Sequence, residues 1–574
     1  MILFIYFISL LIAGQRYLTG EFIYVIATSL LILYIFYNTR EREIKINTNI
    51  LVISGLLYFF SLISFYPFIH LRLEIKGIFY ILFNIIFLLL MASQCGANSI
   101  SIDYLRISLK RIVIVGVILG LFFIKEIFVN PNFLAILVLI GVIIESHNLY
   151  EKRANTIISV ILLIVYFYII FKLNSRGVYL ILIMLLLFKI NDILKKGRWV
   201  ITLGLLIILI PIAVSVLFLK AGEPLSFKRF LIYTHSIDTL RESPARGLGP
   251  GGLQGIATIK NFVYDTDIVF RNLKKFSDAH SSVINLFLAL GFIGGSVILS
   301  ELVILFRSIL NLKKDWLFYV VLAIIFNSIF DITLSCKLIL SIFIISIALL
   351  INNNGFPRIR ISKNILKILI IFILIISLYI FFSDYLWQCF QQTDSTWHLT
   401  QIPGFSPWNE LFLYNNAVLS YNNGDFNKAE DYITGCVKLA PLDKEYNFLL
   451  SEVLYKNKKP FESIKNIKRI ERENIFLYDL FEREALCFLS LGMNEKALEV
   501  LNYISIIEPY ATLPGYFKYN ITKNKKYLYK TIYSYYIINN FINKYNYKDD
   551  RLHRFRFFAQ TQINDMMEEI KNDD

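Results

Sequence analysis

The sequence has few of the residues that build metal sites and disulfide frameworks. Its 574 residues include six histidines and five cysteines, and only 18% of the residues are charged. The cysteines show no CxxC pair and no metal-type spacing, so a disulfide framework is not expected, although a single bridge stays open. The DxD string from Asp265 to Asp267 has no other ligand-type residues around it. We therefore expect no metal and no cofactor.

Long apolar runs dominate the chain instead. Hydrophobic residues make up 56% of it, more than is usual in a soluble globular protein. Short charged loops separate the runs, a pattern that predicts helices crossing a membrane. The predicted fold class is all-α: a polytopic helical membrane domain in residues 1–382, followed by a soluble helical domain. We place about 13 spans at 2–14, 22–37, 50–66, 77–94, 111–128, 132–146, 155–172, 177–190, 199–219, 281–306, 316–331, 335–351 and 365–382.

The N-terminus and the charges set the expected topology. The apolar run from Ile2 to Ala13 has no basic segment before it, so we read it as a retained span rather than a removed signal peptide. Lys and Arg number 58 against 43 Asp and Glu. These cations gather in short loops between spans, so we expect no nucleic-acid partner. One alternating set of loops carries 19 of them and the other 6, which puts loop 220–280 and everything after Phe382 on the exterior side.

A repeat follows the last span. In windows of 34 residues, Ala417, Gly424, Ala429 and Pro441 match residues 68 positions later, namely Ala485, Gly492, Ala497 and Pro509. Small residues let two antiparallel helices pack closely, Gly marks the turn and Pro ends the unit. The middle copy is degenerate, with Ser451, Lys458, Ser463 and Ile475 at these places. The pattern resembles the tetratricopeptide repeat, which implies a protein-binding domain at 408–515 after a linker at 383–407, with a helical tail at 516–574.

The exterior loop contains a glycine-rich stretch, "ARGLGPGG", with Arg246, Gly247, Gly249 and Gly251. Glycines let a backbone approach a ligand closely with its N–H groups pointing inward, and a guanidinium adds a bidentate anion contact. Such a loop suits a phosphate or diphosphate, although a sharp turn alone would explain it equally well. Arg176 and Arg229 lie on the same side by the loop count.

A histidine stands at the entrance to the next long apolar run. His280 has Asp278 before it and Asn285 after it, in "FSDAHSSVINLFLALGFIGG". An imidazole that titrates near neutrality can act as a general base on a hydroxyl, although a lone interfacial histidine is often only a boundary residue. On the same side, Asn130 and Asn132 flank a proline at a tight turn, which is ordinary turn chemistry on its own.

The order of these motifs resembles the O-antigen ligase and polymerase superfamily over about Ile112 to Ser308. The resemblance implies a GT-C type fold and a metal-independent, inverting glycosyltransferase that uses a glycan linked to undecaprenyl diphosphate. It implies that Arg176 and Arg246 contact the diphosphate, that Arg229 assists, and that His280 activates the acceptor. It also implies the bacterial inner membrane, with the site and the repeats in the periplasm. Many relatives have Asn directly after the histidine, where this chain has Ser281.

Several functions remain open at this stage. The leading hypothesis is transfer of a preassembled glycan to a lipid A-core sugar, in the manner of an O-antigen ligase. A protein O-oligosaccharyltransferase acting on Ser or Thr would use the repeats to present its substrate. An O-antigen polymerase would use a second lipid-linked unit as the acceptor. A non-enzymatic scaffold or a transporter is the fourth reading, although few charged residues fall within the predicted spans and no ion relay is evident from the sequence.

Overall fold

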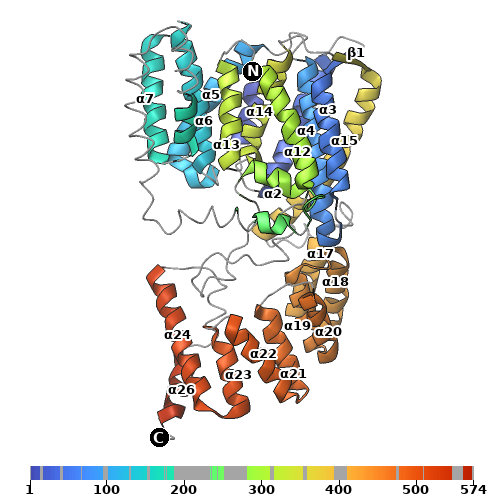
Figure 1. Ribbon diagram of the computed structural model, residues 1–574, viewed down its shortest axis with the longest axis vertical. Coiled ribbons are helices and arrows are strands. Elements are labelled where there is room, and N and C mark those ends of the chain that lie inside the picture. Colours follow the sequence, from blue (N-terminus) through green and yellow to red (C-terminus); the bar gives the residue numbers. More distant parts are fainter. Residues whose placement is uncertain are drawn as a thin grey trace. The chain divides into compact units, whose positions relative to one another are not determined.

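A computed structural model gives the chain as an all-α protein whose described part also contains two short strands (Figure 1). It divides into two compact units, which we describe separately. Unit 1 comprises Met1–Phe65, Glu74–Gly252 and Asp278–Pro407, and unit 2 comprises Tyr66–Leu73, Leu253–Ser277 and Trp408–Asp574. The structure describes residues 2–12, 17–38, 43–65, 67–94, 101–127, 131–151, 155–173, 175, 177–185, 233, 236–241, 243–250, 279, 281–310, 316–331, 333–352, 358–393, 410–472, 478–507, 510–545 and 560–571.

The helices of the described part of unit 1 overlap 11 of the predicted spans; the span at 199–219 lies outside the described residues, and the one at 177–190 is described only to residue 185. These helices are α1 (Ile2–Ile12), α2 (Tyr17–Asn38), α3 (Thr48–Ile63), α4 (Pro67–Gln94, whose first residues belong to unit 2), α5 (Ile102–Ile127), α6 (Pro131–Tyr150), α7 (Thr156–Leu173), α12 (Ser282–Leu310), α13 (Trp316–Phe330), α14 (Lys337–Asn352) and α15 (Lys363–Thr393). A short 3-10 helix, η4 (Thr333–Ser335), precedes α14. Strands β1 (Glu43–Asn47) and β2 (Arg358–Ser362) pair antiparallel, with Lys45 opposite Arg360.

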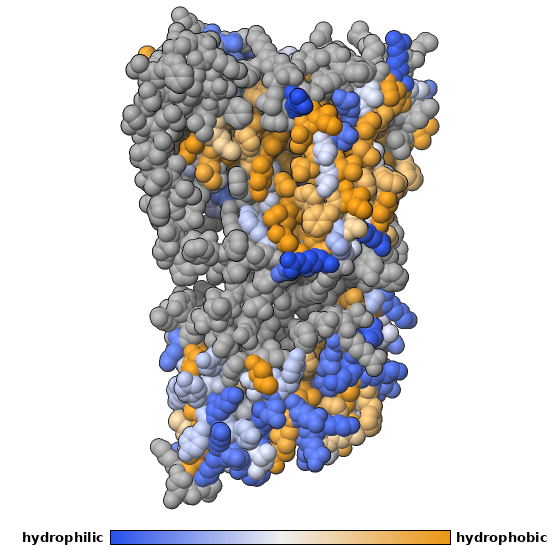
Figure 2. Space-filling model, in the orientation of Figure 1, coloured by the Kyte–Doolittle hydropathy of each residue, from blue (hydrophilic) through white to orange (hydrophobic). Residues whose placement is uncertain are grey.

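Among the described residues, four helices are long and apolar enough to cross a membrane: Leu71–Ser93, Pro131–Tyr150, Thr156–Leu173 and Ser282–Leu305. Several further apolar helices have 10 to 17 residues. Figure 2 shows apolar side chains gathered on the visible face of the unit 1 helices. Helix α6 is buried from Phe133 to Glu145, whereas α7 exposes Ile157, Ile164 and Phe171. A helix that is apolar on all sides can lie either in a protein core or in lipid. The burial of α6 fits the first environment, and the exposed apolar side chains of α7 fit the second. The count of 13 spans stays a prediction.

Helical hairpins follow one another in unit 2. The helices are α17 (Glu410–Asn422), α18 (Phe426–Leu439), α19 (Lys444–Lys456), α20 (Pro460–Arg472), α21 (Tyr478–Ser490), α22 (Asn494–Ile507), α23 (Thr512–Thr522), α24 (Lys525–Tyr545) and α26 (Gln560–Lys571). The first helices of four hairpins begin at residues 410, 444, 478 and 512, a step of 34 residues each time. The 34-residue period of the sequence is therefore also the period at which the helical hairpins begin. It continues into α23, which crosses the predicted end of the repeats at residue 515.

The degenerate middle hairpin keeps the geometry of its neighbours. Its turn residue Lys458 has φ 60°, where Gly424 has φ 76° and Gly492 has φ 71°. Ser451 and Ser463 replace the buried alanines of the other copies, and both are fully buried. Their hydroxyls are satisfied locally, because Ser463 Oγ donates to the carbonyl of Ser451 at 2.9 Å and Ser451 Oγ donates to that of Asn447 at 2.8 Å. Hydrogen-bonded serines therefore fill the alanine positions without a buried polar penalty.

Candidate functional site

The structure describes some of the predicted site residues. Asn132, Arg246, Gly247, Gly249 and Asn285 lie within the described residues. The other predicted site residues lie outside them: Asn130, Arg176, Arg229, Gly251, Asp278 and His280. Their chain neighbours Ser175, Gly177, Ala279 and Ser281 are described, so the backbone around two of the motifs is fixed.

Asp331 lies at the C-terminal end of α13, and two of the motif segments converge on it. Its side chain is buried, and its Oδ2 accepts a hydrogen bond from Asn132 Nδ2 at 2.6 Å. Asn132 stands in the first turn of α6, directly after the Asn-Pro turn. Ser282, the first residue of α12, donates to the backbone carbonyl of Asp331 through its N–H at 3.4 Å and its hydroxyl at 3.3 Å. Segments 199 residues apart in the chain therefore meet here.

The residues on both sides of His280 are held in place. Asn285 Oδ1 accepts a hydrogen bond from the backbone N–H of Ala279 at 2.9 Å. Ser281 Oγ accepts from the N–H of Ile284 at 3.3 Å, the pattern of a serine that caps a helix N-terminus. The Asn285 side chain thus holds the backbone at Ala279, while its role as a supporting residue stays a prediction.

The segment around Arg176 reaches the same helix end. A Cβ added at Gly177 would lie 2.9 Å from Oδ1 of Asn327, so this backbone and that amide are in close contact. Asn327 is buried on α13, and its carbonyl accepts the N–H of Asp331 at 2.8 Å, one turn later. One described residue from each of three predicted motifs, Asn132, Gly177 and Ser282, thus lies against Asn327 or Asp331. The sequence analysis noted Asp331 only as a residue at a span edge, although a carboxylate that ends a long apolar run was a signal.

The glycine-rich loop is arranged differently from our expectation. The N–H of Gly247 donates to the carbonyl of Ser243 at 2.9 Å, that of Leu248 to Leu288 at 2.7 Å, and that of Gly249 to Ala289 at 3.1 Å. The prediction that the N–H groups of this loop point at a ligand is therefore wrong for these three residues. These N–H groups donate to carbonyls of the loop itself and of α12. The α12 carbonyls are free to accept because the kink breaks the helical hydrogen bonds there.

The kink in α12 explains why the loop needs its glycines. Gly291 has φ 70° and ψ −179°, which breaks the helix, and the N–H of Phe292 turns to the carbonyl of Pro244 at 2.7 Å. A Cβ at Gly291 would lie 2.3 Å from the carbonyl oxygen of Ala245, and one at Gly249 would lie 2.2 Å from Oε2 of Glu74 on α4. Glycine is required at both positions by close approach and by positive φ. The loop is therefore packed tightly between α4 and the kink.

Arg246 fixes this loop to the end of α3. Its Nε donates to the carbonyl of Ile63 at 2.8 Å, and a terminal nitrogen of its guanidinium donates to the carbonyl of Phe65. In return Ser64 Oγ donates to the carbonyl of Arg246 at 2.6 Å. Carbonyls at a helix C-terminus lack intrahelical partners and attract cations. The side chain remains exposed to solvent, so a fixed positive charge stands at the loop.

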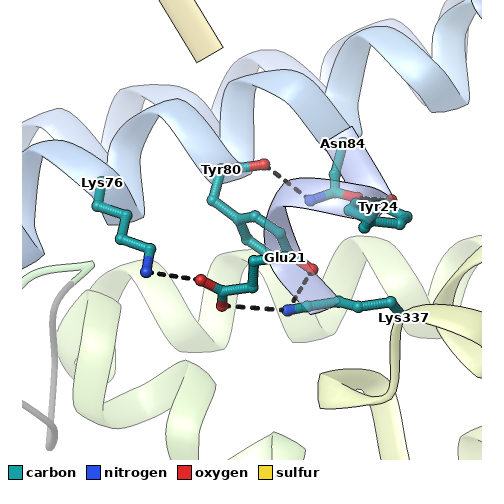
Figure 3. Close-up of polar contacts among 6 residues, drawn as sticks. All are labelled: Glu21, Tyr24, Lys76, Tyr80, Asn84 and Lys337. Atoms are coloured by element: carbon teal, nitrogen blue, oxygen red, sulfur yellow. Dashed lines mark hydrogen bonds and ion pairs between the residues drawn. The ribbon is translucent and has the colours of Figure 1, made fainter. Parts of the chain in front are cut away.

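A cluster of charged residues joins three helices of unit 1 (Figure 3). Oε2 of Glu21, on α2, lies 2.6 Å from Lys76 Nζ, and its Oε1 lies 3.5 Å from Lys337 Nζ. The Lys337 ammonium, at the start of α14, also donates to Tyr80 Oη at 2.9 Å. The side chains of Glu21, Lys76 and Lys337 are 14 to 20% exposed. The sequence analysis did not connect these charged residues, which come from three different helices.

Helix α4 links the charged cluster to the glycine-rich loop. Lys76, Tyr80 and Asn84 follow one another at intervals of four residues on one face, and Asn84 Oδ1 accepts from Tyr24 Oη at 2.5 Å (Figure 3). Glu74 and Gly77 of the same helix contact the loop, at Gly249 and Pro250. The sequence analysis had counted Lys76 and Lys337 among loop cations. For Lys76 the reason is that hydropathy started the span at residue 77, whereas α4 begins at Pro67.

No family model and no curated protein matches the chain. Within the described ranges, no three side chains of His, Cys, Asp or Glu come together as ligands of a metal ion. What the described site offers is a buried carboxylate with its amide partner, a fixed guanidinium, and two ammonium groups that share one carboxylate. These groups suit an anionic ligand and a reaction that moves a proton.

Proposed function

We propose that the chain is a membrane glycosyltransferase that moves a preassembled glycan from a polyprenyl diphosphate to a hydroxyl acceptor. The supporting observation is the convergence of the three motif segments on Asn327 and Asp331. The three motifs are far apart in the sequence: Asn-Pro-Asn, Ser-Arg-Gly and Ala-His-Ser-Ser. Local chain geometry does not explain why they come together. A shared reaction site would explain it.

The proposed chemistry assigns one role to each kind of group. The acceptor oxygen attacks the anomeric carbon and forms the new glycosidic bond, while the bond from that carbon to the diphosphate oxygen breaks. The acceptor proton passes to His280, and the diphosphate leaves with the electron pair. Positive charge near the leaving group stabilises it, and Arg246, Arg176 and Arg229 would supply that charge. Asp331 would hold the His280 turn through Ser282 and the neighbouring Asn132.

The distance along α12 sets the scale of such a site. Nine residues separate Ser282, beside His280, from the kink at Gly291, where the loop of Arg246 is attached. At a rise of 1.5 Å per residue this is roughly 14 Å. In the reaction the acceptor oxygen and the diphosphate oxygen both stand at the anomeric carbon. The reacting sugar would therefore lie between the two ends of this stretch, with His280 at one end and the diphosphate-binding loop at the other.

The proposal includes a location and an acceptor. We propose about 13 spans in the bacterial inner membrane, with loop 220–280 and the hairpins of unit 2 in the periplasm, as the loop charges indicate. The leading acceptor is a lipid A-core sugar. The 34-residue hairpin step favours a second candidate, a protein Ser or Thr hydroxyl, because tetratricopeptide-like hairpins present peptides and proteins in their groove.

In vitro transfer tests both candidates. The purified full-length chain in nanodiscs would receive a lipid-linked glycan together with either a rough lipopolysaccharide or an unfolded Ser- and Thr-rich polypeptide. We expect a glycan-carrying product with one acceptor class and none with the other. Gly55→Ala, a change at an exposed position on α3, is the matched control and should transfer at the wild-type rate. Absence of product with both acceptors, from protein that binds the donor lipid, would contradict the transferase proposal.

A further inference from the structure

The end of the hairpin series has an unusual distribution of charge. The 38 residues from Ala511 to Lys548 contain seven lysines and nine tyrosines, and no aspartate or glutamate. The preceding 103 residues, 408–510, contain 16 acidic residues. Within this segment no carboxylate stands among the lysines; acidic residues follow directly at Asp549 and Asp550 and occur again on α26. The segment is therefore strongly basic and aromatic within an otherwise mixed unit.

Helix α24 sorts these residues onto two faces. Leu528 and Tyr535 are buried in a cluster with Leu513 of α23 and with Ile563 and Met566 of α26. The other face shows Tyr529, Tyr533 and Tyr536, which are 53, 63 and 38% exposed. Lys526 and Lys530 are exposed on the same side, at helical spacing from these tyrosines. We call these five residues the Tyr/Lys face.

The packing fixes the Tyr/Lys face in its outward orientation. Thr531 Oγ1 donates to the carbonyl of Thr512 at 3.3 Å, and a Cβ at Gly515 would lie 2.4 Å from that hydroxyl, so α23 and α24 are in close contact. Positive charges also crowd behind the face. Burial, and then the nearby Lys530 ammonium, lower the pKa of Lys518 to about 8. Lys518 and Lys530 therefore place two lysines near each other at this end of the unit.

We infer that the Tyr/Lys face binds the anionic surface of a phospholipid bilayer. Tyrosine is enriched at membrane interfaces because its ring is apolar and its hydroxyl is polar. Lysine beside it gains attraction to anionic headgroups within a Debye length. The same chain carries helices able to cross a membrane, so the effective concentration of the bilayer is high and a weak contact suffices. The inference goes beyond the proposed transferase and does not depend on it.

Lipid quenching in nanodiscs tests the inference on the full-length chain. A variant with Cys95 and Cys389 replaced by Ser, and with Tyr533→Cys, would carry a polarity-sensitive fluorophore at position 533. Leu419→Cys on α17, which is 37% exposed, provides the matched control label. The buried thiols of Cys336, Cys436 and Cys487 are expected to stay unlabelled in folded protein.

In nanodiscs that contain phosphatidylglycerol we expect headgroup spin-labelled lipid to quench the label at 533 several-fold more than the label at 419. Zwitterionic nanodiscs, about 0.5 M salt (a Debye length of about 4 Å), or the pair Lys526→Gln and Lys530→Gln should remove that difference. Equal quenching in anionic and zwitterionic nanodiscs would overturn the inference. So would a label that responds to an added acidic polypeptide and not to lipid, because the face would then bind a protein.

Discussion

The contact between α4 and the glycine-rich loop makes a sharp prediction for Gly77→Ala. A Cβ at this position would lie 2.7 Å from Cβ of Pro250 and 2.8 Å from its carbonyl carbon and oxygen. Carbon atoms normally approach to about 3.5 Å, and neither a proline ring nor a backbone can rotate away. The loop and the helix must therefore separate by several tenths of an ångström.

Two opposing effects determine the change in stability. Alanine is favoured over glycine inside a helix by up to about 1 kcal/mol. Overpacking in a tight contact costs about 1 to 3 kcal/mol. We expect the second effect to dominate and the variant to be destabilised by roughly 1 kcal/mol. Since Arg246 moves with the loop, we also expect glycan transfer to fall on the order of tenfold, because small displacements of positioned groups reduce rates strongly.

Gly55→Ala is the matched control, since Gly55 lies inside α3 and a Cβ there would meet nothing within 4 Å. It should stabilise the protein slightly or leave it unchanged, with wild-type transfer. Thermal midpoints of the two purified variants in one detergent, together with initial transfer rates, make the comparison. If Gly77→Ala matched Gly55→Ala in both measurements, the loop would not be packed against α4 as described.

Three further predictions concern unit 2 and the site. Lys458→Gly removes a side chain from a left-handed backbone position, so the middle hairpin should gain roughly 0.5 to 1 kcal/mol, seen as two- to five-fold slower hydrogen exchange in α19 and α20. Burial raises the pKa of Glu484 from 4.5 to about 7 against the opposing effect of the Lys468 ammonium 2.7 Å away, so the folded protein holds a proton that the unfolded chain releases; stability from this group should fall by at most about 3 to 4 kcal/mol as pH rises from 4.5 through 7. Labelling of the buried Cys487 thiol, compared at each pH with Glu484→Gln, should reveal this loss, and an unchanged ratio would contradict it. Asp331→Ala removes the oxygen that accepts from Asn132 and keeps the backbone carbonyl that Ser282 uses, so the protein should still fold and transfer should slow roughly tenfold; a wild-type rate would remove the Asp331 side chain from the site.

The helices and the hairpin step were predictable because both are local patterns. An apolar run such as that of α6 or α12 specifies a helix wherever it packs, and a 34-residue period specifies its own geometry. Even Lys458 could be placed in its left-handed turn from the register of Gly424 and Gly492. Helix starts were less predictable. Helix α5 begins at Ile102, nine residues before the predicted span, because hydropathy stops at charged residues while backbone hydrogen bonding does not.

The site was only partly predictable, because its contacts are distant in sequence. Asn132 and Asp331 are 199 residues apart, and no pattern near either residue announces the other. The glycines of the loop were recognised from the sequence, but the structural cause for them was not. They allow α4 and the kinked α12 to approach the loop closely, and these contacts are visible only in the folded structure. Likewise Glu21, Lys76 and Lys337 each look like an isolated charge near a span end until three helices bring them together.

The central claim is that the segments gathered around Asp331 form a glycan-transfer site with His280 as its base. The most direct test is the rate at which the purified full-length chain releases polyprenyl diphosphate from a lipid-linked glycan when acceptor is present, for the wild type and for His280→Ala. The account predicts acceptor-dependent release by the wild type and its near-complete loss in the variant, with donor binding retained. Release at the wild-type rate from folded His280→Ala protein, or release by neither, would contradict it.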